Sequence, residues 1–455
     1  MPNLSDSLSP MRPLLVLFAS LLVSLSPGCT SQPGVGACRT VLNCKDDASP
    51  ICDANSLSCR ACQPGTDDTA CKNRDSKTPR CGSAGRCVGC LTSNDCKGLS
   101  TPTCSSQNVC TGCLQATDCP SRVCNADHSC APQSDVIYVD NKNGSCAAVT
   151  HSGALDDPFC LIQDAVTAAV NANKAVISVT PSTKAYEAVT ISNVGSAGLS
   201  ISSSGGTASP VQIRGTNNAA VSVTVAAGTK VLLTDLDLAA SSGNGLDCSG
   251  GADLTLLTSR VHHSVNGIVV NGCVLTLDGV RVYKNDNNGI YLQTSTAYSL
   301  NNLMIWNNNA SGIALQASGQ GTLRFVTVYA NGNPSLTQPP GIDCGAGSNM
   351  IDNAIVFNNI SSLSGNLLDK QTQGCTLNNV VTNDSKSGTY KTQIDFVNAL
   401  GGDPSMYDLR LKSDSAANAD CCIDKVLGAA PIDHDIDNNR RPQGNGSDIG
   451  ASEVR

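Results

Sequence analysis

Aromatic residues are scarce in this sequence: they make up 3% of its 455 residues, with one tryptophan, five phenylalanines and eight tyrosines. This scarcity is typical of a narrow core that valine, leucine, isoleucine and alanine fill better than rings. Basic residues are also few, since 29 lysines and arginines are outnumbered by 37 acidic residues and the net charge is −8. Nucleic-acid binding requires a basic face, so we expect no nucleic-acid partner.

The sequence begins with an apolar run that is too short to span a bilayer. Leu14–Leu25 has twelve residues and follows Arg12, which is the pattern of a signal peptide. We predict a signal peptide at residues 1–28 and a tether at 29–37. Gly28 and Cys29 resemble the lipobox of bacterial lipoproteins, which implies lipidation of Cys29 and a membrane anchor. Ser26 and Pro27 depart from that pattern, so ordinary signal cleavage is the alternative.

Cysteine, in contrast, is abundant. The 25 cysteines indicate an oxidising compartment and therefore export. Residues 38–130 hold sixteen of them in four units of four, with two residues between successive units. The resulting CxxC pairs also fit zinc, but the export signal, the even number and the single histidine, His128, favour disulfides. We predict a small disulfide-rich stalk, which resembles the short cysteine repeats of bacterial surface proteins; a protein-binding module is the alternative.

A repeat organises the second half of the chain. A glycine followed by an aliphatic residue recurs with steps of 22, 22, 23 and 29 residues, at Gly245, Gly267, Gly289, Gly312 and Gly341. A fixed period in the twenties predicts a solenoid, whose units bury their apolar sides only by stacking. Within a unit the apolar residues alternate, as in Leu275 and Leu277, and no amphipathic helix separates the strands. We therefore predict an all-β fold, a parallel β-helix with coils at residues 199–398.

Residues 136–198 precede the coils and are expected to close the open end of the solenoid. Residues 161–173 carry one apolar helical stripe between two strand-like runs, at 136–139 and 175–179. We predict a cap helix there. The order of these motifs resembles the N-terminal region of right-handed parallel β-helix proteins of the pectate-lyase-like superfamily, which implies a right-handed coil.

The solenoid contains cysteines and asparagines at corresponding positions of successive repeats. Cys146 and Cys160 bracket one loop, and Cys248 and Cys344 each have a cysteine at the start of the strand after the next glycine step, Cys273 and Cys375. We expect the bridges Cys146–Cys160, Cys248–Cys273 and Cys344–Cys375. A vicinal bridge between Cys421 and Cys422 is left open. The asparagines resemble the ladder of the superfamily, which implies a structural role; they are Asn285, Asn308, Asn331 and then Asn358 or Asn359.

Residues 399–455 are expected to form a C-terminal cap segment. Asp433, Asp435 and Asp437 have the spacing of a calcium loop, but Asn438 replaces the turn glycine and Gly444 the final glutamate. The sequence therefore gives no metal site and no cofactor, although calcium is an alternative. The end of the chain resembles the DIGAxE terminus of bacterial β-helix surface proteins, and we favour a segment pinned by Asp–Arg pairs.

The candidate catalytic residues are a small group on neighbouring strands. Arg260 and Arg281 are expected to stack beside His262 and His263, which would make a patch that faces an anion. The alternative is a structural ion pair between Arg260 and Asp237 on the adjacent strand. The paired aspartates of pectin hydrolases and the DPH motif of alginate epimerases are absent, and fold alone does not establish activity.

A stripe of aromatic residues is the second candidate site. Tyr283, Trp306, Tyr329 and Phe357 each follow an inward aliphatic residue in four successive coils. If exposed, such a strip suits the faces of sugars in an extended glycan. The alternative is that the insertion at 333–340 or the C-terminal segment covers it and the rings only stabilise stacking.

Three classes of function are compatible with these patterns. The first is a cell-surface or periplasmic, lipid-anchored β-helix protein with a structural or binding role, whose partner is an extracellular polysaccharide or a surface protein. The second is a polysaccharide lyase or hydrolase that acts on an acidic glycan. The third is a protein-binding role of the cysteine units. The expected location is the outer membrane or the cell surface, with secretion as the alternative.

Overall fold

The computed structural model describes residues 38–454 apart from gaps at 97–100, 106–107, 114–115, 126–128, 143–145, 147–149, 295–296, 317–318, 336, 346–347, 361–374, 384–387, 400–402 and 429. The predicted signal peptide, the tether and Cys29 therefore lie outside the described residues. The chain divides into two compact units, one within Met1–Gly89 and the other within Cys90–Arg455. Across the described part of the chain, no helix combines the length and apolarity that a membrane span requires.

The four cysteine units share one disulfide pattern. In each, the first cysteine bonds to the third and the second to the fourth, and the last two face each other on a short antiparallel ladder. The regular elements are η1 (Val41–Asn43), β1 (Ile51–Asp53), β2 (Ser58–Arg60), α1 (Asp68–Arg74), β3 (Arg80–Cys81), β4 (Cys87–Val88), η2 (Ser93–Cys96), β5 (Thr103–Cys104), β6 (Cys110–Thr111) and η3 (Ala116–Asp118). The disulfides predicted from the sequence are therefore present in all four units.

A second feature recurs five residues after the first cysteine of a unit. The side chains of Asn43, Asp67 and Asp95 accept hydrogen bonds from backbone N–H groups at the start of their units. A unit with almost no apolar core depends on such local bonds and on its bridges, each worth roughly 2–4 kcal/mol. The aspartate or asparagine at this position is therefore a repeated structural feature of the units, as the cysteines are.

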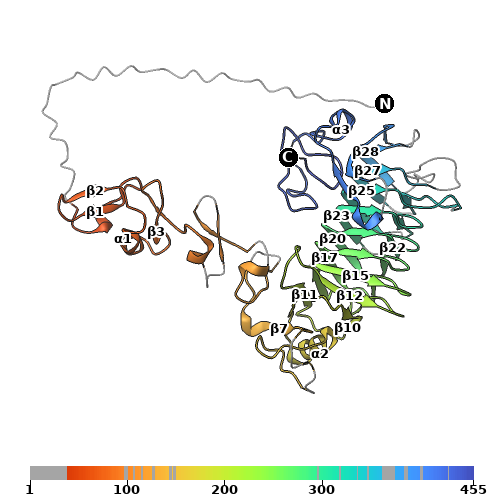
Figure 1. Ribbon diagram of the computed structural model, residues 1–455, viewed down its shortest axis with the longest axis horizontal. Helices are drawn as coiled ribbons and strands as arrows, with labels where there is room; N and C mark the ends of the chain where they lie inside the picture. The colour runs from red at the N-terminus through yellow and green to blue at the C-terminus, as the bar shows by residue number, and fades with distance from the viewer. Residues whose placement is uncertain are drawn as a thin grey trace, which may run out of the picture. The chain divides into compact units, whose positions relative to one another are not determined.

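The second compact unit is dominated by a stack of triangular coils with parallel strands (Figure 1). Each coil contributes one strand to each of three faces. Face A consists of β7 (Val136–Val139), β8 (Val176–Val179), β11 (Leu199–Ser203), β14 (Lys230–Thr234), β17 (Asp253–Leu257), β20 (Val274–Asp278) and the first halves of β23 (Ala297–Trp306), β25 (Gln320–Tyr329), β27 (Ser348–Phe357) and β28 (Cys375–Thr382).

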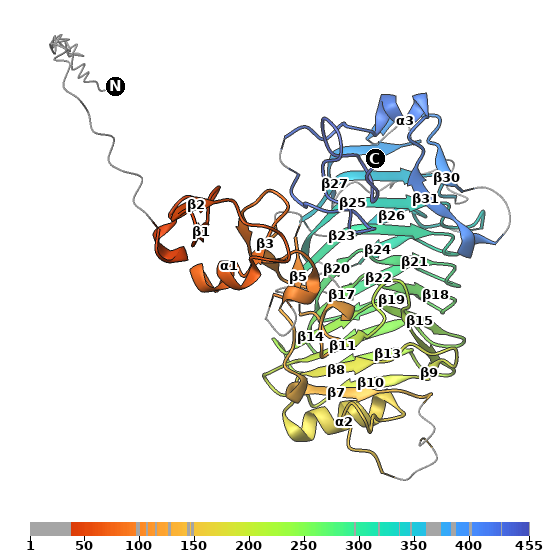
Figure 2. The same ribbon diagram turned by 60° about the vertical axis from the view of Figure 1, so that its left-hand side comes forward.

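The other two faces complete each coil. Face B consists of β9 (Tyr186–Glu187), β12 (Val211–Gly215), β15 (Leu236–Ala240), β18 (Arg260–His262), β21 (Arg281–Tyr283), the second halves of β23, β25, β27 and β28, and β29 (Thr389–Tyr390). Face C consists of β10 (Val189–Ser192), β13 (Val221–Thr224), β16 (Leu246–Ser249), β19 (Ile268–Asn271), β22 (Ile290–Thr294), β24 (Ile313–Leu315) and β26 (Ile342–Cys344). Figure 2 shows the same stack of strands after a turn of the molecule.

Alternating aliphatic residues fill the inside of the coils. Leu254, Leu275 and Leu277 are fully buried, as are their counterparts in neighbouring coils. The corner between faces A and B is a single residue in the left-handed conformation, which turns the chain without a loop. This residue is Asp235, Thr258, Gly279, Asn302, Phe325, Asn353 or Asn379 in successive coils. Such a sharp corner places the outer side chains of two faces around one edge.

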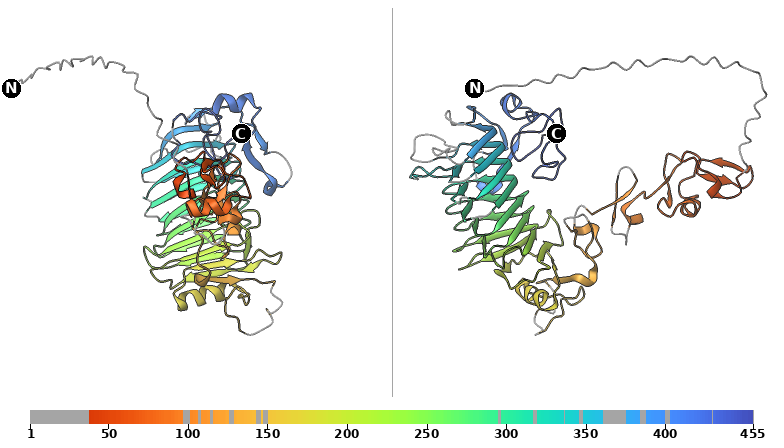
Figure 3. Two further views of the ribbon diagram at one scale, coloured as in Figure 1. Left: turned by 90° about the vertical axis from the view of Figure 1, so that its left-hand side faces the viewer. Right: turned by 180° about the vertical axis from the view of Figure 1, so that it is seen from behind.

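The stack begins earlier than the sequence suggested. β8, β9 and β10 already pair with β11, β12 and β13, so a complete coil lies within the range 136–198 that we assigned to the cap. The expected helix is α2 (Ile162–Ala172), which follows η4 (Gln133–Asp135) and β7 along the chain. It buries Ile162, Ala165, Val166 and Ala169 in the solenoid core. α2 lies at the end of the stack in Figure 3.

Two ladders of side-chain amides run along the coils. Asn285, Asn308, Asn331 and Asn359 bond one to the next through side-chain oxygens at 2.7–2.9 Å. This is the expected ladder, and Asn359 rather than Asn358 continues it. The second ladder was not predicted: Asn266 bonds to Asn244, and Asn288 bonds to Asn266. These residues directly precede the repeated glycines, so the signal was present in the sequence.

Disulfides also join parts of the solenoid. The structure pairs Cys146 with Cys160, Cys248 with Cys273 and Cys344 with Cys375, with Cα–Cα distances of 5.7, 6.2 and 5.8 Å. These are the pairs expected from the sequence. Cys421 and Cys422, which were left open, bond to each other. All 24 cysteines of the described residues are therefore oxidised.

The C-terminal segment packs on the outer side of face B. It contains β30 (Phe396–Asn398), η6 (Pro404–Met406), β31 (Asp408–Leu411) and α3 (Ala416–Cys421). Its apolar residues form a second core with the outward side chains of β21, β23, β25 and β27. We expected this segment to cap the end of the solenoid. Its described residues instead cover the side of the solenoid at face B. Its buried ion pair, Arg441 with Glu453 at 2.7 Å, lies within the segment itself.

Candidate functional site

The candidate catalytic residues lie on the outer side of face B. Arg260 is opposite Asp237 on one side and opposite Arg281 on the other, and His262 is opposite Tyr283. In this register the outward polar side chains of β15, β18 and β21 form one row, a polar column, along the solenoid axis. In the later coils the same column continues as Met304 and then Thr327, where the C-terminal segment covers it. The polar part of face B is therefore the part that remains uncovered.

Asp237 is the centre of this polar surface. Its carboxylate accepts hydrogen bonds from Arg214 at 2.6 Å and from His262 Nε2 at 3.0 Å. Burial would raise the pKa of Asp237, but the bonds and charges of His262 and Arg214 outweigh it and lower the pKa below its usual value. The alternative that the sequence offered, an ion pair between Asp237 and Arg260, is therefore wrong. The two residues are opposite each other, but Arg214 and His262 hold the carboxylate.

The two histidines form a chain that starts at Asp237. His262 stacks on Tyr283, with ring centroids 4.9 Å apart and an interplanar angle of 21°. Its Nδ1 lies 2.6 Å from Nδ1 of His263. His263 is exposed and occupies a left-handed corner with φ of 49°. Burial, followed by the charges of His262 and Lys284, lowers the pKa of His263 and so favours its neutral form.

A cleft runs along the corner between faces A and B, beside the histidines. Its floor includes Asp235, Thr258 and Gly279 from three successive coils, and Arg260 and Arg281 line it from face B. Burial raises the pKa of Asp235 to about 6, although the Thr258 hydroxyl opposes this shift. Arg281 is paired with Asp437 of the C-terminal segment at 2.5 Å. Arg260 is the exposed arginine of this group, and no ion pair to it is found within the described residues.

His434 connects the C-terminal segment to the wall of the cleft. Its Nε2 lies 3.2 Å from Asp278 and its Nδ1 lies 2.9 Å from Asp433. The bond to Asp278 is the largest cause that raises the pKa of His434 to about 9; burial opposes it and Asp433 adds to it. The protonated ring is thus the form that links the segment to β20.

We expect the C-terminal segment to loosen as the pH rises from 6.5 to 9. The folded pKa of His434, about 9, exceeds the unfolded value of 6.5, so its contribution is complete below 6.5 and is lost as the pH passes 9. Denaturation followed by tryptophan fluorescence should show falling stability across this window. His434→Gln should flatten the profile, whereas Asp433→Asn, at a carboxylate whose side chain is 93% exposed, should largely preserve it. An unchanged profile in His434→Gln would contradict the assignment.

The aromatic stripe is not open to solvent in the structure. Tyr283, Trp306, Tyr329 and Phe357 are at most 7% exposed and pack against Phe396, Leu409, Leu411 and other apolar residues of the C-terminal segment. Trp306 also donates a hydrogen bond from Nε1 to the Pro404 carbonyl at 2.7 Å. Of the two alternatives that the sequence left, the structure has the covered strip: it is the coil side of the second core, and the C-terminal segment is its cover.

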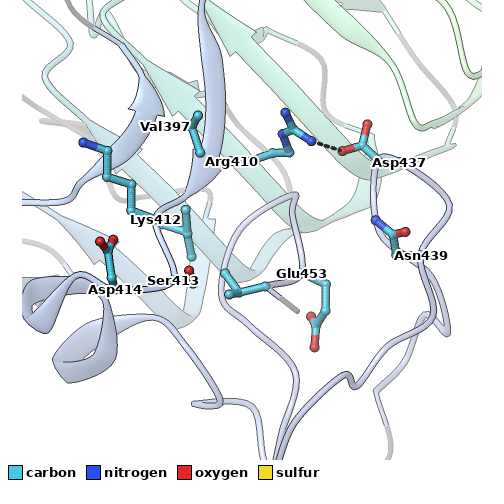
Figure 4. Close-up of a pocket in the computed structure, with 10 residues that line it drawn as sticks. Val397, Arg410, Lys412, Ser413, Asp414, Asp437, Asn439 and Glu453 are labelled. Carbon is cyan, nitrogen blue, oxygen red and sulfur yellow. Dashed lines mark ion pairs between the residues drawn. The ribbon is translucent and has the colours of Figure 1, made fainter.

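A further pocket lies within the C-terminal segment (Figure 4). It has a volume of about 680 Å³ and is lined by Arg410, Lys412, Asp414, Asp437 and Glu453 among others. Arg410 is paired with Asp408 and lies 3.9 Å from Asp437, and Glu453 is bound to Arg441. The remaining Lys412 and Asp414 carry opposite charges. This pocket presents no excess of either charge, in contrast to the surface around Arg260.

The described residues offer neither paired acids nor a metal centre at these positions. On face C, Asp247 is opposite Val269 and Asp343 is opposite Ala314, so the acids are isolated. In the part of the chain that the structure describes, the groups close enough to share a metal ion are cysteine sulfurs of the four units, and these are in disulfides. The uncovered part of face B carries the exposed Arg260, with Arg214 and His263 close by.

Several residues of this surface were not found by sequence analysis. Arg214 lies in a coil where the glycine repeat is not visible, and Asp278 occupies a face A position with no repeated partner. Lys284 pairs with Asp403 at 2.9 Å, and His434 and Asp437 also come from the C-terminal segment. No local pattern connects residues so far apart in the chain.

Comparison with known proteins agrees with this architecture. A family model described as a right handed beta helix region matches residues 175–360, which form most of the coils. The coils therefore constitute a right-handed parallel β-helix. No curated protein matches the chain.

Three solved structures are similar at low identity. Pectate lyase Pel9A is 14% identical with a TM-score of 0.39, covering 70% of this chain and 96% of that one. The Dettilon tailspike protein gp208 is 14% identical with a TM-score of 0.33, covering 55% and 56%. The catalytic domain of a GH87 alpha-1,3-glucanase, in complex with tetrasaccharides, is 13% identical with a TM-score of 0.30, covering 53% and 47%. At these values the likeness carries no conclusion about activity.

Proposed function

We propose that the protein is an exported β-helix protein that binds an extended acidic polysaccharide along the uncovered part of face B and the adjoining corner cleft. The observation that carries this proposal is Arg260, an exposed guanidinium that lies opposite Arg281 and next to the Arg214–Asp237 pair. A planar guanidinium binds carboxylate and sulfate groups through two parallel hydrogen bonds. A surface of this kind is suited to an anionic ligand.

The coil spacing supports a polymer rather than a small anion. Successive strands are about 4.8 Å apart along the solenoid, which is close to the length of one sugar unit in an extended glycan. Arg260 and Arg281 occupy adjacent coils, and the cleft continues past Asp235 and Thr258 in the same direction. A polysaccharide that runs along the axis would therefore meet arginine side chains at two successive steps.

Export is part of this proposal. Its support is the complete pairing of the described cysteines, because disulfides of this density persist in oxidising compartments. Attachment to an outer membrane through lipidated Cys29 is proposed on the sequence pattern alone. In such an arrangement the cysteine units would join the membrane anchor to the solenoid.

The proposal is tested by calorimetric titration of the full chain with polygalacturonate and with neutral dextran. We expect binding to the acidic polymer, weakened by salt because exposed charges are screened. Arg260→Gln should weaken it about tenfold, since a hydrogen bond to a charged group contributes roughly 1.5–3 kcal/mol.

A matched control is Arg86→Gln, which removes the same charge from an exposed position in the cysteine units and should leave the affinity unchanged. Equal affinity of the Arg260→Gln variant and the unmodified protein would contradict the assigned surface. Binding to dextran as tight as to polygalacturonate would contradict an acidic ligand. Appearance of an unsaturated sugar product, read by its absorbance, would replace the binding role with a lyase.

A further inference from the structure

The contact between His262 and His263 limits how much charge the pair holds. Nδ1 of one ring lies 2.6 Å from Nδ1 of the other, and the rings meet edge to face at 84°. A hydrogen bond of this length has room for one proton between the two nitrogens. Nε2 of His262 faces the ionised Asp237 and therefore carries a proton of its own.

Counting protons gives the states that this geometry permits. With one proton at Nε2 of His262 and one between the Nδ1 atoms, both rings are neutral and Nε2 of His263 is free. One further proton, at Nε2 of His263, gives the pair a single positive charge and keeps the contact. A fourth proton would place two N–H donors against each other, so the contact must break for both rings to be charged.

Charged groups face the pair from several elements. Arg214 on β12 and Lys284 after β21 are cations, while Asp237 on β15 and Asp403 of the C-terminal segment are anions. Tyr283 stacks on His262 and fixes that ring. His263 is exposed and meets Tyr283 only edge to face, with ring centroids 6.5 Å apart, so it is the less constrained of the two rings. Burial, His262 and Lys284 together lower the pKa of His263, so these neighbours disfavour its charged form.

We propose that the His262–His263 pair is a proton-operated element of the anion-binding surface. At neutral pH the shared proton holds His263 against His262. When both rings are charged in acid, the Nδ1 contact opens and the His263 imidazolium binds a carboxylate of the polysaccharide beside Arg260. This inference rests on the proposed function and adds to it that the affinity rises as the pH falls.

The experiment measures the affinity of the full chain for polygalacturonate between about pH 7.5 and about pH 5, at constant ionic strength. We expect a rise of about tenfold, which is the effect of one added charge-assisted bond. His263→Asn should flatten this profile. Asparagine fits the backbone, because Asn307 and Asn358 occupy the same left-handed corner in other coils.

The outcomes separate this inference from the proposed function. Failure to bind at any pH contradicts the proposed function itself. Binding with a flat profile in the unmodified protein, or a pH-dependent rise that persists in His263→Asn, overturns the proton-operated element and leaves the binding surface standing. Imidazole nitrogen shifts from NMR provide an independent readout: loss of the Nδ1 to Nδ1 hydrogen bond on acidification is expected, and its retention in the doubly charged pair would overturn the inference.

Discussion

Replacing Arg441 by methionine is expected to detach much of the C-terminal segment from face B. Arg441 is 3% exposed, and its guanidinium donates to Glu453 at 2.7 Å, to the Asp448 and Gly450 carbonyls and to the His434 carbonyl. It also lies 4.2 Å above the Phe325 ring at the corner of the coils. Removing it leaves the buried Glu453 carboxylate without its cation, which costs roughly 3–5 kcal/mol.

The single tryptophan reports this detachment directly. Trp306 is 3% exposed beneath the segment and is bonded to Pro404. Its emission should therefore shift to the red in Arg441→Met under conditions where the unmodified protein is folded, and the unfolding midpoint should fall. The neighbouring Arg440 is exposed, so Arg440→Met provides the matched control and should change the stability by about 0.5 kcal/mol or less.

A double variant tests whether the unpaired Glu453 charge causes the loss of stability. Replacing both partners, Arg441→Met with Glu453→Met, should recover much of the lost stability, because an apolar pair leaves no buried charge behind. If Arg441→Met alone unfolds at the same midpoint as the unmodified protein and Trp306 emission is unchanged, the buried pair does not hold the segment.

Replacing Asn308 by alanine is expected to destabilise the coils by about 2–4 kcal/mol. Asn308 is 1% exposed. Its oxygen accepts from the backbone and side chain of Asn285, and its nitrogen donates to the Val282 carbonyl and to Asn331. Alanine leaves at least two of these buried groups unpaired, and each unsatisfied group costs roughly 1–3 kcal/mol.

The adjacent Asn309 provides the control for the ladder. It is exposed, although its side chain also bonds to a neighbouring coil. Asn309→Ala should therefore cost about 0.5 kcal/mol. Denaturation gives the stability difference, and hydrogen exchange at the Asn285 amide should become faster in Asn308→Ala. Similar stabilities of the two variants would show that the ladder contributes little.

The surface around Asp237 shows how far a repeat pattern predicts a site. The alignment of coils placed Asp237 opposite Arg260, and Arg260 opposite Arg281, as the structure has them. It gave the wrong ionic partner for Asp237, because Arg214 reaches the carboxylate from another coil. Strand register fixes which backbones are neighbours, but the rotamers and reach of long side chains decide which charges pair.

The sequence by itself determined the features that repeat. The glycine period, the alternation of aliphatic residues and the recurrence of Asn285, Asn308 and Asn331 predicted the β-helix and one ladder, because each coil packs only on its neighbours. The same logic indicated the pairs Cys248–Cys273 and Cys344–Cys375. Only the tertiary structure decided that the aromatic stripe is buried. The cover comes from a segment without the repeat, in which Pro404 lies 98 residues beyond Trp306. A contact between such distant segments depends on how the chain returns to face B, and no local period encodes that return.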